Sequence, residues 1–291
     1  MKKNIAVILV NYNGVSDTIE CIQSLYNSSI FVQIVVVDNA SKNNELSLIT
    51  KKFPAVKTIQ LEANIGFAGG NNVGIKWALE NGYEYISLLN NDTIIDKDLF
   101  KNLLECADEK TVAAPYMYYH SHPNELWYGG GYINRWTGNA KHIFKKSIDN
   151  SIFECSFVTG CCFIAHRLIW KSIGLLDESY FMYHEDTDFC IRLKKHNCKI
   201  KINPTAKIWH KVGQSGGGEN SAFSIYYNTR NRLICIKKYK FFFHFTAELF
   251  SITTRCIRML LLMAKGRNEW TAFYEGLKDA QKNIIGSSYK G

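Results

Sequence analysis

Two groups of acidic side chains stand where they could support chemistry. Asp92 closes the run LLNND (residues 88–92), in which apolar residues give way to polar ones. A carboxylate at the tip of a buried strand can hold a divalent cation through hard oxygen ligands. It could equally cap a helix that begins near Asp96. Asp92 alone therefore leaves a cation site and a helix cap both open.

The second group is the sequence HEDTD, which places Glu185, Asp186 and Asp188 in the first turn of an expected helix over 185–196. Basic residues end that helix, and this charge order is what the helix dipole favours without any function. One carboxylate facing a crevice would also make a competent general base for a sugar hydroxyl. His210, which ends a later strand, is either a core histidine or a metal ligand.

Polar, compact sequences follow four expected strands. They are NYNG (residues 11–14), DNAS (38–41), NIGFAGGNN (64–72) and NND (90–92). In open parallel sheets, ligands bind beyond the carboxyl ends of the strands, so these four loops should converge on one crevice. Asp38 could accept hydrogen bonds from a ribose or a base edge there, or it could cap a helix beside Ser41.

Two nucleotide-binding classes are disfavoured by the loop after the first strand. It contains no GxGxxG fingerprint, which a dinucleotide-binding dehydrogenase would need there, and nothing in the chain resembles GxxxxGK[ST]. The glycines between residues 66 and 74 follow the third strand, where tight turns and helix packing would also use them.

The elements that position these loops are predicted by hydrophobic patterning. Short β-branched runs at 5–10, 34–38, 56–61 and 85–90 are strands, and residues 16–26, 44–52 and 71–81 between them are helical. Strands that are apolar on both faces and alternate with helices favour a parallel sheet covered on both sides. The fold class is therefore α/β, with a Rossmann-like nucleotide-binding half.

The second half has a different texture. Aromatics and glycines with short strands occupy 112–155, and an apolar strand-like run covers 157–165. After the helix at 185–196, two short strands at 199–202 and 207–209 flank Pro204. Four glycines in residues 213–218 predict a mobile loop or a hinge.

Composition indicates an ordinary globular chain with a basic tail. The 291 residues are 46% hydrophobic and 21% charged, which excludes wholesale disorder. Residues 231–291 hold 11 Lys and Arg against 4 Asp and Glu, whereas residues 1–230 hold 24 against 22. We expect two units, a catalytic domain at 1–230 and a helical tail at 231–291. Nucleic-acid binders and membrane-surface anchors share such a charge bias, and we expect no nucleic acid.

Residues 241–263 form the most hydrophobic stretch, but His244, Glu248, Arg255 and Arg258 make it costly at bilayer depth. The predicted helix has an apolar face and basic flanks. The face comprises Phe245, Leu249, Ile252, Cys256, Met259 and Met263, and the flanks are Lys237, Lys238, Lys240, Lys265 and Arg267. Such a helix either packs on the catalytic domain or on a second subunit, as in a homodimer, or lies on a membrane surface.

The start of the chain and the cysteines favour the cytoplasm. The apolar run at 5–10 is too short for a secretory signal, and the nine cysteines show no framework spacing. We expect reduced cysteines in a cytoplasmic protein, with the tail allowing attachment to the inner face of the cell membrane.

Taken in order, the motifs resemble a known family. NYNG, VVDNAS, NIGFAGGNN, LLNND, VTGCCFIAHR, GLLDESYFMYHEDTDFCIRL and PTAKIWHKVGQS resemble the inverting family 2 glycosyltransferases over about residues 4–215. The likeness is greatest to the bacterial rhamnosyltransferase-like branch that builds surface polysaccharides such as O-antigen, capsule and cell wall. The tail resembles the same branch more loosely.

The resemblance implies a GT-A fold, a nucleotide-diphosphate donor such as a dTDP- or UDP-sugar, and a saccharide or polyprenyl-linked acceptor. Carried onto this sequence, it assigns roles residue by residue. Donor contacts would come from Asn11, Tyr12, Asp38, Asn64, Asn91 and Asp92; Asp92 and His210 would bind metal; and Asp186 would be the catalytic base, with Glu185 beside it.

One departure concerns the cofactor. Asn90 stands where the fuller DxD motif has its first Asp, and an amide is a weaker ligand than a carboxylate. The resemblance implies Mg²⁺ or Mn²⁺, which this residue would hold less tightly. Two other classes stay open: a nucleotidyltransferase or other nucleotide-sugar enzyme, and a non-catalytic membrane-binding module.

Overall fold

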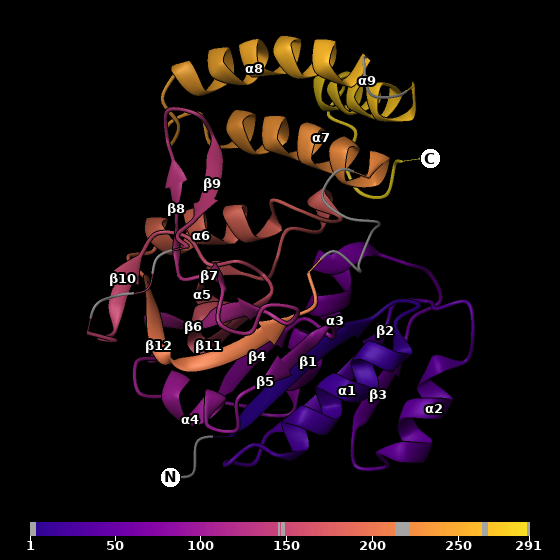
Figure 1. Ribbon diagram of the computed structural model, residues 1–291, viewed down its shortest axis with the longest axis vertical. Coiled ribbons are helices and arrows are strands. Elements are labelled where there is room, and N and C mark those ends of the chain that lie inside the picture. The colour runs from indigo at the N-terminus through magenta and orange to yellow at the C-terminus, as the bar shows by residue number, and fades with distance from the viewer. Residues whose placement is uncertain (1–3, 145, 147–148, 213–220, 264–266, 290–291) are drawn as a thin grey trace.

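The computed structural model describes residues 4–144, 146, 149–212, 221–263 and 267–289. Its centre is a mixed sheet whose strands run in the order β10-β12-β6-β11-β4-β1-β2-β3, with β5 paired to β12 and β7 to β6. The expected α/β fold class is confirmed. Figure 1 shows helices against this sheet and a separate helical layer formed by the end of the chain.

The first half matches the predicted alternation. Strands β1 (Ile5–Asn11), β2 (Gln33–Asp38), β3 (Lys57–Gln60) and β4 (Tyr85–Leu89) are parallel, in the order β4-β1-β2-β3. Helices α1 (Val15–Tyr26), α2 (Glu45–Lys52) and α3 (Gly66–Glu80) connect them. All residues of β4 are buried and all of β1 except Val10, as expected for strands covered on both faces.

Helix α3 begins five residues earlier than predicted and includes the glycine-rich sequence GFAGG. A Cβ atom on Gly70 would lie 2.9 Å from Cγ1 of Val10, and one on Gly74 would lie 2.3 Å from Cγ2 of Ile8. These glycines let the helix pack directly on β1. The helix therefore starts at the crevice edge, at Gly66.

The second half adds strands that pair antiparallel with their neighbours, except that β12 and β6 run parallel to each other. The added strands are β5 (Thr93–Ile95), β6 (Thr111–Tyr119), β7 (Leu126–Tyr128), β10 (Phe153–Cys155), β11 (Cys162–His166) and β12 (Lys199–His210), with the separate hairpin β8 (Gly131–Asn134) and β9 (Asn139–His142). The helices are α4 (Leu99–Leu103), α5 (Arg167–Ile173), the short η1 (Glu178–Tyr180) and α6 (Glu185–Lys195). Of the strand-like run predicted at 157–165, only the part from Cys162 is β-strand, and it extends to His166.

The two short strands predicted on either side of Pro204 are one strand, β12. Its pairing with β6 shifts register between Asn203 and Lys207. Proline has no N–H for the ladder, and the irregularity accommodates it. The Asn203 side chain accepts hydrogen bonds from the N–H and hydroxyl of Thr205 at 3.0 and 2.7 Å. A proline at such a bulge need not end a strand.

The end of the chain forms the predicted helical tail, with α7 (Ala222–Lys238), α8 (Thr246–Met263) and α9 (Arg267–Gln281). The boundary expected at 230/231 lies inside α7. Tyr226 of α7 donates a hydrogen bond to Asp279 of α9 at 2.5 Å, and Lys238 pairs with Asp177 and Asp188. The tail is therefore packed on itself and tied to the α/β body.

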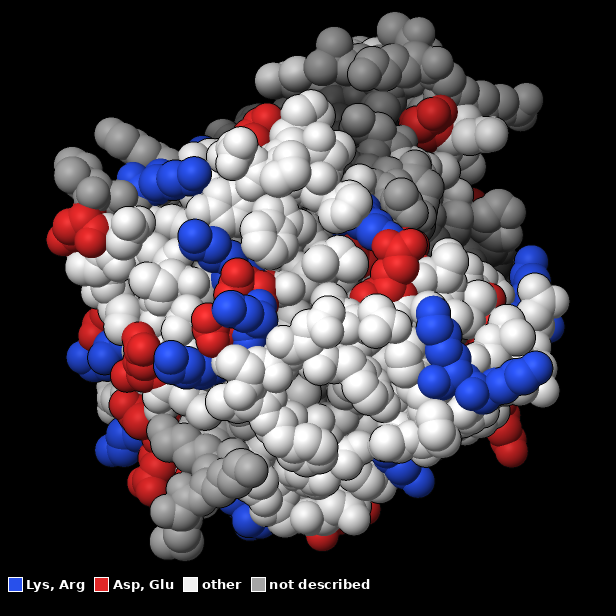
Figure 2. All heavy atoms as spheres, turned by 60° about the horizontal axis from the view of Figure 1, so that its bottom comes forward, with Lys and Arg blue, Asp and Glu red and all other residues white. Residues whose placement is uncertain are grey.

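Surface charge is mixed on the face drawn in Figure 2. Lys and Arg side chains there stand among Asp and Glu side chains, with broad uncharged surface between them. None of the helices that the structure describes is both long and apolar enough to cross a bilayer. The glycine-rich loop predicted at 213–218 lies outside the described residues.

Candidate active site

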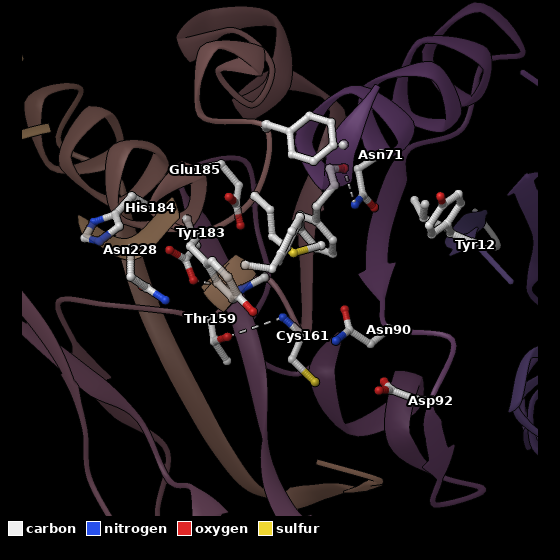
Figure 3. Close-up of a pocket in the computed structure, with 18 of the residues that line it drawn as sticks. Tyr12, Asn71, Asn90, Asp92, Thr159, Cys161, Tyr183, His184, Glu185 and Asn228 are labelled. Carbon is white, nitrogen blue, oxygen red and sulfur yellow. Dashed lines mark hydrogen bonds between the residues drawn. The ribbon is translucent and has the colours of Figure 1, made fainter. Parts of the chain in front are cut away.

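A large open cavity lies at the carboxyl ends of the parallel strands, as the strand-end loops predict. Its volume is about 1510 Å³, and its wall is drawn from all parts of the chain. Figure 3 shows His184, Glu185 and Asn228 on one side and Tyr12, Asn90 and Asp92 on the other. All four predicted loops contribute. They provide Tyr12, Asn13, Gly14, Asn39, Asn64, Gly66, Asn90, Asn91 and Asp92.

Asn11 and Asp38 lie buried behind this wall. The Asp38 carboxylate accepts hydrogen bonds from Nδ2 of Asn11 at 2.7 Å, from the N–H of Ser41 at 2.9 Å and from Nε2 of Gln60 at 2.8 Å. Burial raises the pKa of Asp38, but the hydrogen bonds from Ser41, Asn11 and Gln60 outweigh it, so the pKa is lowered. Asp38 is thus an ionised carboxylate that closes the turn at Ser41. Helix α2 begins later, so Asp38 is not its cap.

The loops after β1, β2 and β3 are tied to one another by amide side chains. Asn39 donates from Nδ2 to Oδ1 of Asn64 at 3.0 Å and accepts from the N–H of Ile65 at 2.9 Å. Asn91 donates to the hydroxyl of Thr18, which donates in turn to Oδ1 of Asn11 at 2.7 Å. Asn64 and Asn91 therefore stand on a preorganised wall that the buried Asn11 and Asp38 support from behind, with Tyr12 half exposed at its edge.

Asp92 and His210 meet although they are far apart in sequence. Strand β12 pairs with β5 directly after Asp92, with His210 opposite Thr93. This pairing brings Nε2 of His210 to 3.1 Å from Oδ1 of Asp92, and both side chains are over nine-tenths buried. Helix α4 starts at Leu99, after an N-cap at Asp98. The Asp92 carboxylate therefore faces His210 and does not cap this helix.

The Asp92–His210 pair has the donor atoms of a divalent cation site. It offers a carboxylate oxygen and an imidazole nitrogen at the cavity wall. Nδ1 of His210 is buried and makes no hydrogen bond within the described part of the chain. The described residues contain no cluster of three or more His, Cys, Asp or Glu that could hold a metal. Further ligands would have to come from a bound substrate, from water or from amide oxygens such as that of Asn90.

Glu185 and Asp186 occupy another wall. Asp186 accepts a hydrogen bond from the N–H of Thr187 at 2.7 Å, and Oε2 of Glu185 is buried with no hydrogen-bond partner in the ranges described. Burial raises the pKa of Asp186 to about 6, opposed by hydrogen bonds from Thr187 and Gly160. Burial and the adjacent Asp186 carboxylate raise the pKa of Glu185 well above its ordinary value. Of the two, Asp186 therefore ionises more readily, and Glu185 holds its proton more tightly.

The third acid of this cluster has a structural place. Asp188 is fully buried and accepts from Nε of Arg192 at 2.6 Å and from the hydroxyl of Tyr239 at 2.6 Å, in addition to pairing with Lys238. It fixes α6 against α7. The helix-dipole interpretation therefore explains part of the HEDTD sequence, whereas Glu185 and Asp186 face the cavity.

Several lining residues were not predicted from the sequence. Trp127 packs edge-on against both His210 and His142, with ring centroids 4.6 and 5.1 Å away. The tail lines one side of the cavity, and the residues that it supplies are Phe223, Asn228, Thr229, Arg232, Thr254 and Phe273. No motif marked these positions. The aromatic and glycine-rich texture around residue 127 was the only signal for any of them.

The chain is similar in sequence to known glycosyltransferases. The model of glycosyl transferase family 2 matches residues 6–174. The chain is 26% identical over 240 residues to the low-salt glycan biosynthesis hexosyltransferase Agl10 of Haloferax volcanii, covering 80% of this chain and 76% of the relative. It is 24% identical over 249 residues to the dTDP-rhamnosyl transferase RfbF of Shigella flexneri, covering 82% and 81%.

Solved structures share the fold. GalNAc-T7 with UDP, GalNAc and Mn²⁺ aligns with a TM-score of 0.63 at 15% identity, covering 80% of this chain and 47% of that one. The mannosyltransferase PcManGT of Pyrobaculum calidifontis, with GDP-Man and Mn²⁺, aligns with a TM-score of 0.59 at 13% identity, covering 97% and 86%. At these identities the likeness shows the GT-A fold alone.

Proposed function

The chain belongs to glycosyl transferase family 2, and from this premise we propose that it transfers a sugar, with inversion, from a nucleotide-diphosphate donor to a saccharide or lipid-linked acceptor. A dTDP- or UDP-sugar is the proposed donor, with rhamnose as the first sugar to test, and surface polysaccharide synthesis is the proposed setting. The observation that carries the proposal is one cavity with the Asp186 carboxylate on one wall and the Asp92–His210 pair on another.

The donor would lie along the loops after β1 to β4. Tyr12 offers an aromatic face at the cavity edge, and the ionised Asp38, buried behind the cavity wall, would be the acceptor for the N–H or hydroxyl groups of a nucleoside. Asn64 and Asn91 add amide groups to the same wall. To reach Asp38, a nucleoside must displace one of its hydrogen-bond donors, of which Gln60 is the most exposed.

The diphosphate would lie toward Asp92 and His210. Their donor atoms fit a divalent cation, Mg²⁺ or Mn²⁺, which when bound supplies positive charge against the leaving diphosphate. Mn²⁺ in the similar structures of GalNAc-T7 and PcManGT supports this assignment. Asn90, beside the pair, is uncharged and adds no carboxylate ligand. We therefore propose that cation binding depends on the phosphate oxygens of the sugar donor.

Asp186 would be the general base. The acceptor hydroxyl oxygen forms a bond to the anomeric carbon as the carbon–oxygen bond to the diphosphate breaks, and the bonding pair leaves with the diphosphate. The hydroxyl proton passes to Asp186. Glu185 retains its own proton, because a second charge beside Asp186 in this buried place is unfavourable.

The test of this function is a panel of nucleotide sugars, with turnover measured by release of nucleoside diphosphate. We expect one donor class to be consumed, and Asp186→Asn to reduce turnover at least 1000-fold while the dissociation constant for the donor stays within threefold, since the change removes a base and keeps the shape. Asp149→Asn, an exposed site, is the control. Near wild-type turnover in Asp186→Asn would show that another group is the base.

The acceptor side is proposed to face a membrane. We define the apolar ridge as Trp136, Phe241, Phe245, Leu249, Ile257 and Leu260, all of which are exposed. The tilted rings of Trp136 and His244 have centroids 3.9 Å apart, and those of His244 and Phe245 have centroids 4.4 Å apart, so the hairpin tip and the start of α8 form one surface. From Phe245 to Leu260 the ridge extends for about 22 Å along the helix.

This ridge differs in part from the apolar face predicted for the helix. Phe245, directly before α8, and Leu249 within α8 are both exposed, so these two residues of the predicted face point away from the body. Ile252, Cys256, Met259 and Met263 lie outside the described side chains. Of the predicted basic flanks, Lys237 and Lys238 are hydrogen-bonded to Ala280 and to Asp177 and Asp188, and the side chains of Lys265 and Arg267 are not described.

Other cations border the ridge. Arg135 and Lys194 both lie over the Phe242 ring, at 5.2 and 5.7 Å, and Lys240 is exposed beside Phe241. Glu248 is the acidic side chain described among them. An exposed apolar ridge with a cationic border suits an anionic lipid surface. Because Thr254 of the same helix lines the cavity, a lipid-linked acceptor in that surface would reach Asp186 from the tail side.

Vesicle sedimentation tests this placement with the full chain. We expect binding to vesicles that contain phosphatidylglycerol, release as salt rises, and a fall of roughly 100-fold in partitioning for the triple change Phe245→Ser, Leu249→Ser and Ile257→Ser. Phe31→Ser with Leu48→Ser, two equally exposed apolar residues elsewhere, should bind like wild type. A wild-type dimer that the triple change dissociates, without vesicle binding, would assign the ridge to a second copy of the chain instead.

A further inference from the structure

The segment directly before the proposed base has an unusual backbone. We call residues 180–184 the base segment. Three of its non-glycine residues have positive φ angles: Phe181 at 64°, Tyr183 at 67° and His184 at 72°. Bulky side chains rarely adopt this region, because Cβ then crowds the backbone. Such a conformation persists only where surrounding contacts impose it.

The contacts that impose it come from the tail. Nδ2 of Asn231, on α7, lies 2.8 Å from the carbonyl oxygen of Tyr180, 2.8 Å from that of Met182 and 2.9 Å from that of Tyr183. The two N–H hydrogens of one amide thus serve three carbonyl groups of the base segment, with one hydrogen shared between two oxygens. Asn231 is fully buried, so these carbonyl oxygens have this amide in place of water.

Arg230 sets the orientation of that amide. Its Nε donates to Oδ1 of Asn231 at 2.8 Å, which turns the NH₂ group toward the base segment. Its terminal nitrogens donate to the carbonyl oxygen of Tyr180 at 3.0 Å and to that of Gly286 at 2.8 Å. Arg230 is also fully buried. We call Arg230 and Asn231 together the carbonyl clamp.

Of the two remaining carbonyls of the segment, that of His184 accepts from the N–H of Asp188 at 2.9 Å, and that of Phe181 is held from the other side. The oxygen of Phe181 accepts from the N–H of Phe67 at 2.7 Å, at the start of α3. Gly66 is needed for this approach, because a Cβ there would lie 2.3 Å from that oxygen. The base segment is therefore fixed between the donor-side helix α3 and the tail helix α7.

From this geometry we propose that Asn231, oriented by Arg230, is a positioning residue that aims Glu185 and Asp186 into the cavity. The inference rests on the proposed transferase function for its catalytic consequence. It gives the tail a role in the reaction that is independent of whether the apolar ridge binds a membrane. Neither residue of the clamp lines the cavity wall as described, so the clamp acts through the base segment.

The first test removes the clamp amide. In Asn231→Ala and Asn231→Asp, we expect kcat for donor turnover to fall about 100-fold or more, because an ångström of misplacement of a base has effects of that size. The KM for the donor should stay within threefold. Asn231→Asp is the sharper variant, since it keeps the shape and replaces a donor by an oxygen that repels three carbonyl oxygens.

The matched control is Asn203→Ala. Asn203 is equally buried, and its Nδ2 donates to the carbonyl oxygen of Asn102 at 2.7 Å. It lies on β12, seven residues before His210, and makes no contact with the base segment in the hydrogen bonds described. We expect Asn203→Ala to lower the melting temperature as much as Asn231→Ala does while its kcat stays unchanged. That result would separate positioning of the base from general destabilisation. Equal losses of kcat in both variants, following stability alone, would overturn the proposal.

Hydrogen–deuterium exchange makes the test independent of turnover. Asn231→Ala should raise amide exchange at least tenfold in residues 180–187, with residues 85–89 of β4 unchanged, and Asn203→Ala should leave both regions as in wild type. If the wild-type protein consumes no nucleotide sugar, the proposed function fails while this measurement still decides on the clamp. Unchanged exchange in the segment of Asn231→Ala would refute it.

Discussion

Replacing Asp186 by Asn should make the protein more stable at neutral pH, by an amount that disappears in acid. Burial raises the pKa of Asp186 in the folded chain to about 6, from an ordinary value of 3.8. Between these two values the folded state binds the proton more tightly than the unfolded state does, so the free energy of unfolding falls as pH rises from about 4 to about 6. Asparagine has no such titration.

The size of the effect follows from the shift. A difference of about 2 pKa units corresponds to about 3 kcal/mol of unfolding free energy. Removing the Asp186 charge also removes one cause of the raised pKa of Glu185, so part of the titration passes to that residue. We therefore expect the advantage of Asp186→Asn over wild type to grow by about 2–3 kcal/mol between pH 4 and pH 7.5. Loss of the hydrogen bond that Asp186 accepts from the N–H of Gly160 changes the free energy of unfolding by an amount that does not vary with pH.

The assay is urea unfolding of both proteins at several pH values in this range, with Asp149→Asn as an exposed control. Turnover of wild type should move the opposite way and rise with pH through about 6, because Asp186 accepts a proton only when ionised. A stability difference that is constant with pH, or that shrinks toward neutral pH, would refute the buried-base reasoning.

Two further predictions concern the walls of the cavity. Asp92→Ala and His210→Ala should each weaken donor binding in the presence of Mn²⁺. The double variant should bind the donor no more weakly than the more impaired single variant, because both residues would hold one ion. Full turnover in excess EDTA would contradict this. Gly66→Ala should destabilise the chain by about 2–5 kcal/mol, since a Cβ there would lie 2.3 Å from the Phe181 oxygen at a φ of 81°. Gly82→Ala, at a φ of 80° with no atom within 4 Å of the added Cβ, should cost only about 1–2 kcal/mol.

The sequence determined the elements of the first half and the loops at their ends. Alternating runs of about six β-branched residues can be buried only in a parallel sheet covered by helices, so the pattern also fixed which ends share a cavity. Tyr12, Asn64 and Asp92 were found in this way. The pairing of an acid with His210 was not visible in any spacing, and family resemblance alone suggested it.

Tertiary structure decided the contacts made across large sequence separations. Pairing of β12 with β5 brings His210 to Asp92, and packing of α7 places Asn231 on the base segment. Local patterning reports which face of an element is apolar, but it does not report which distant element covers that face. This is why the hydrophobic pattern did not show that the tail lines the cavity, or that Phe245 and Leu249 are exposed.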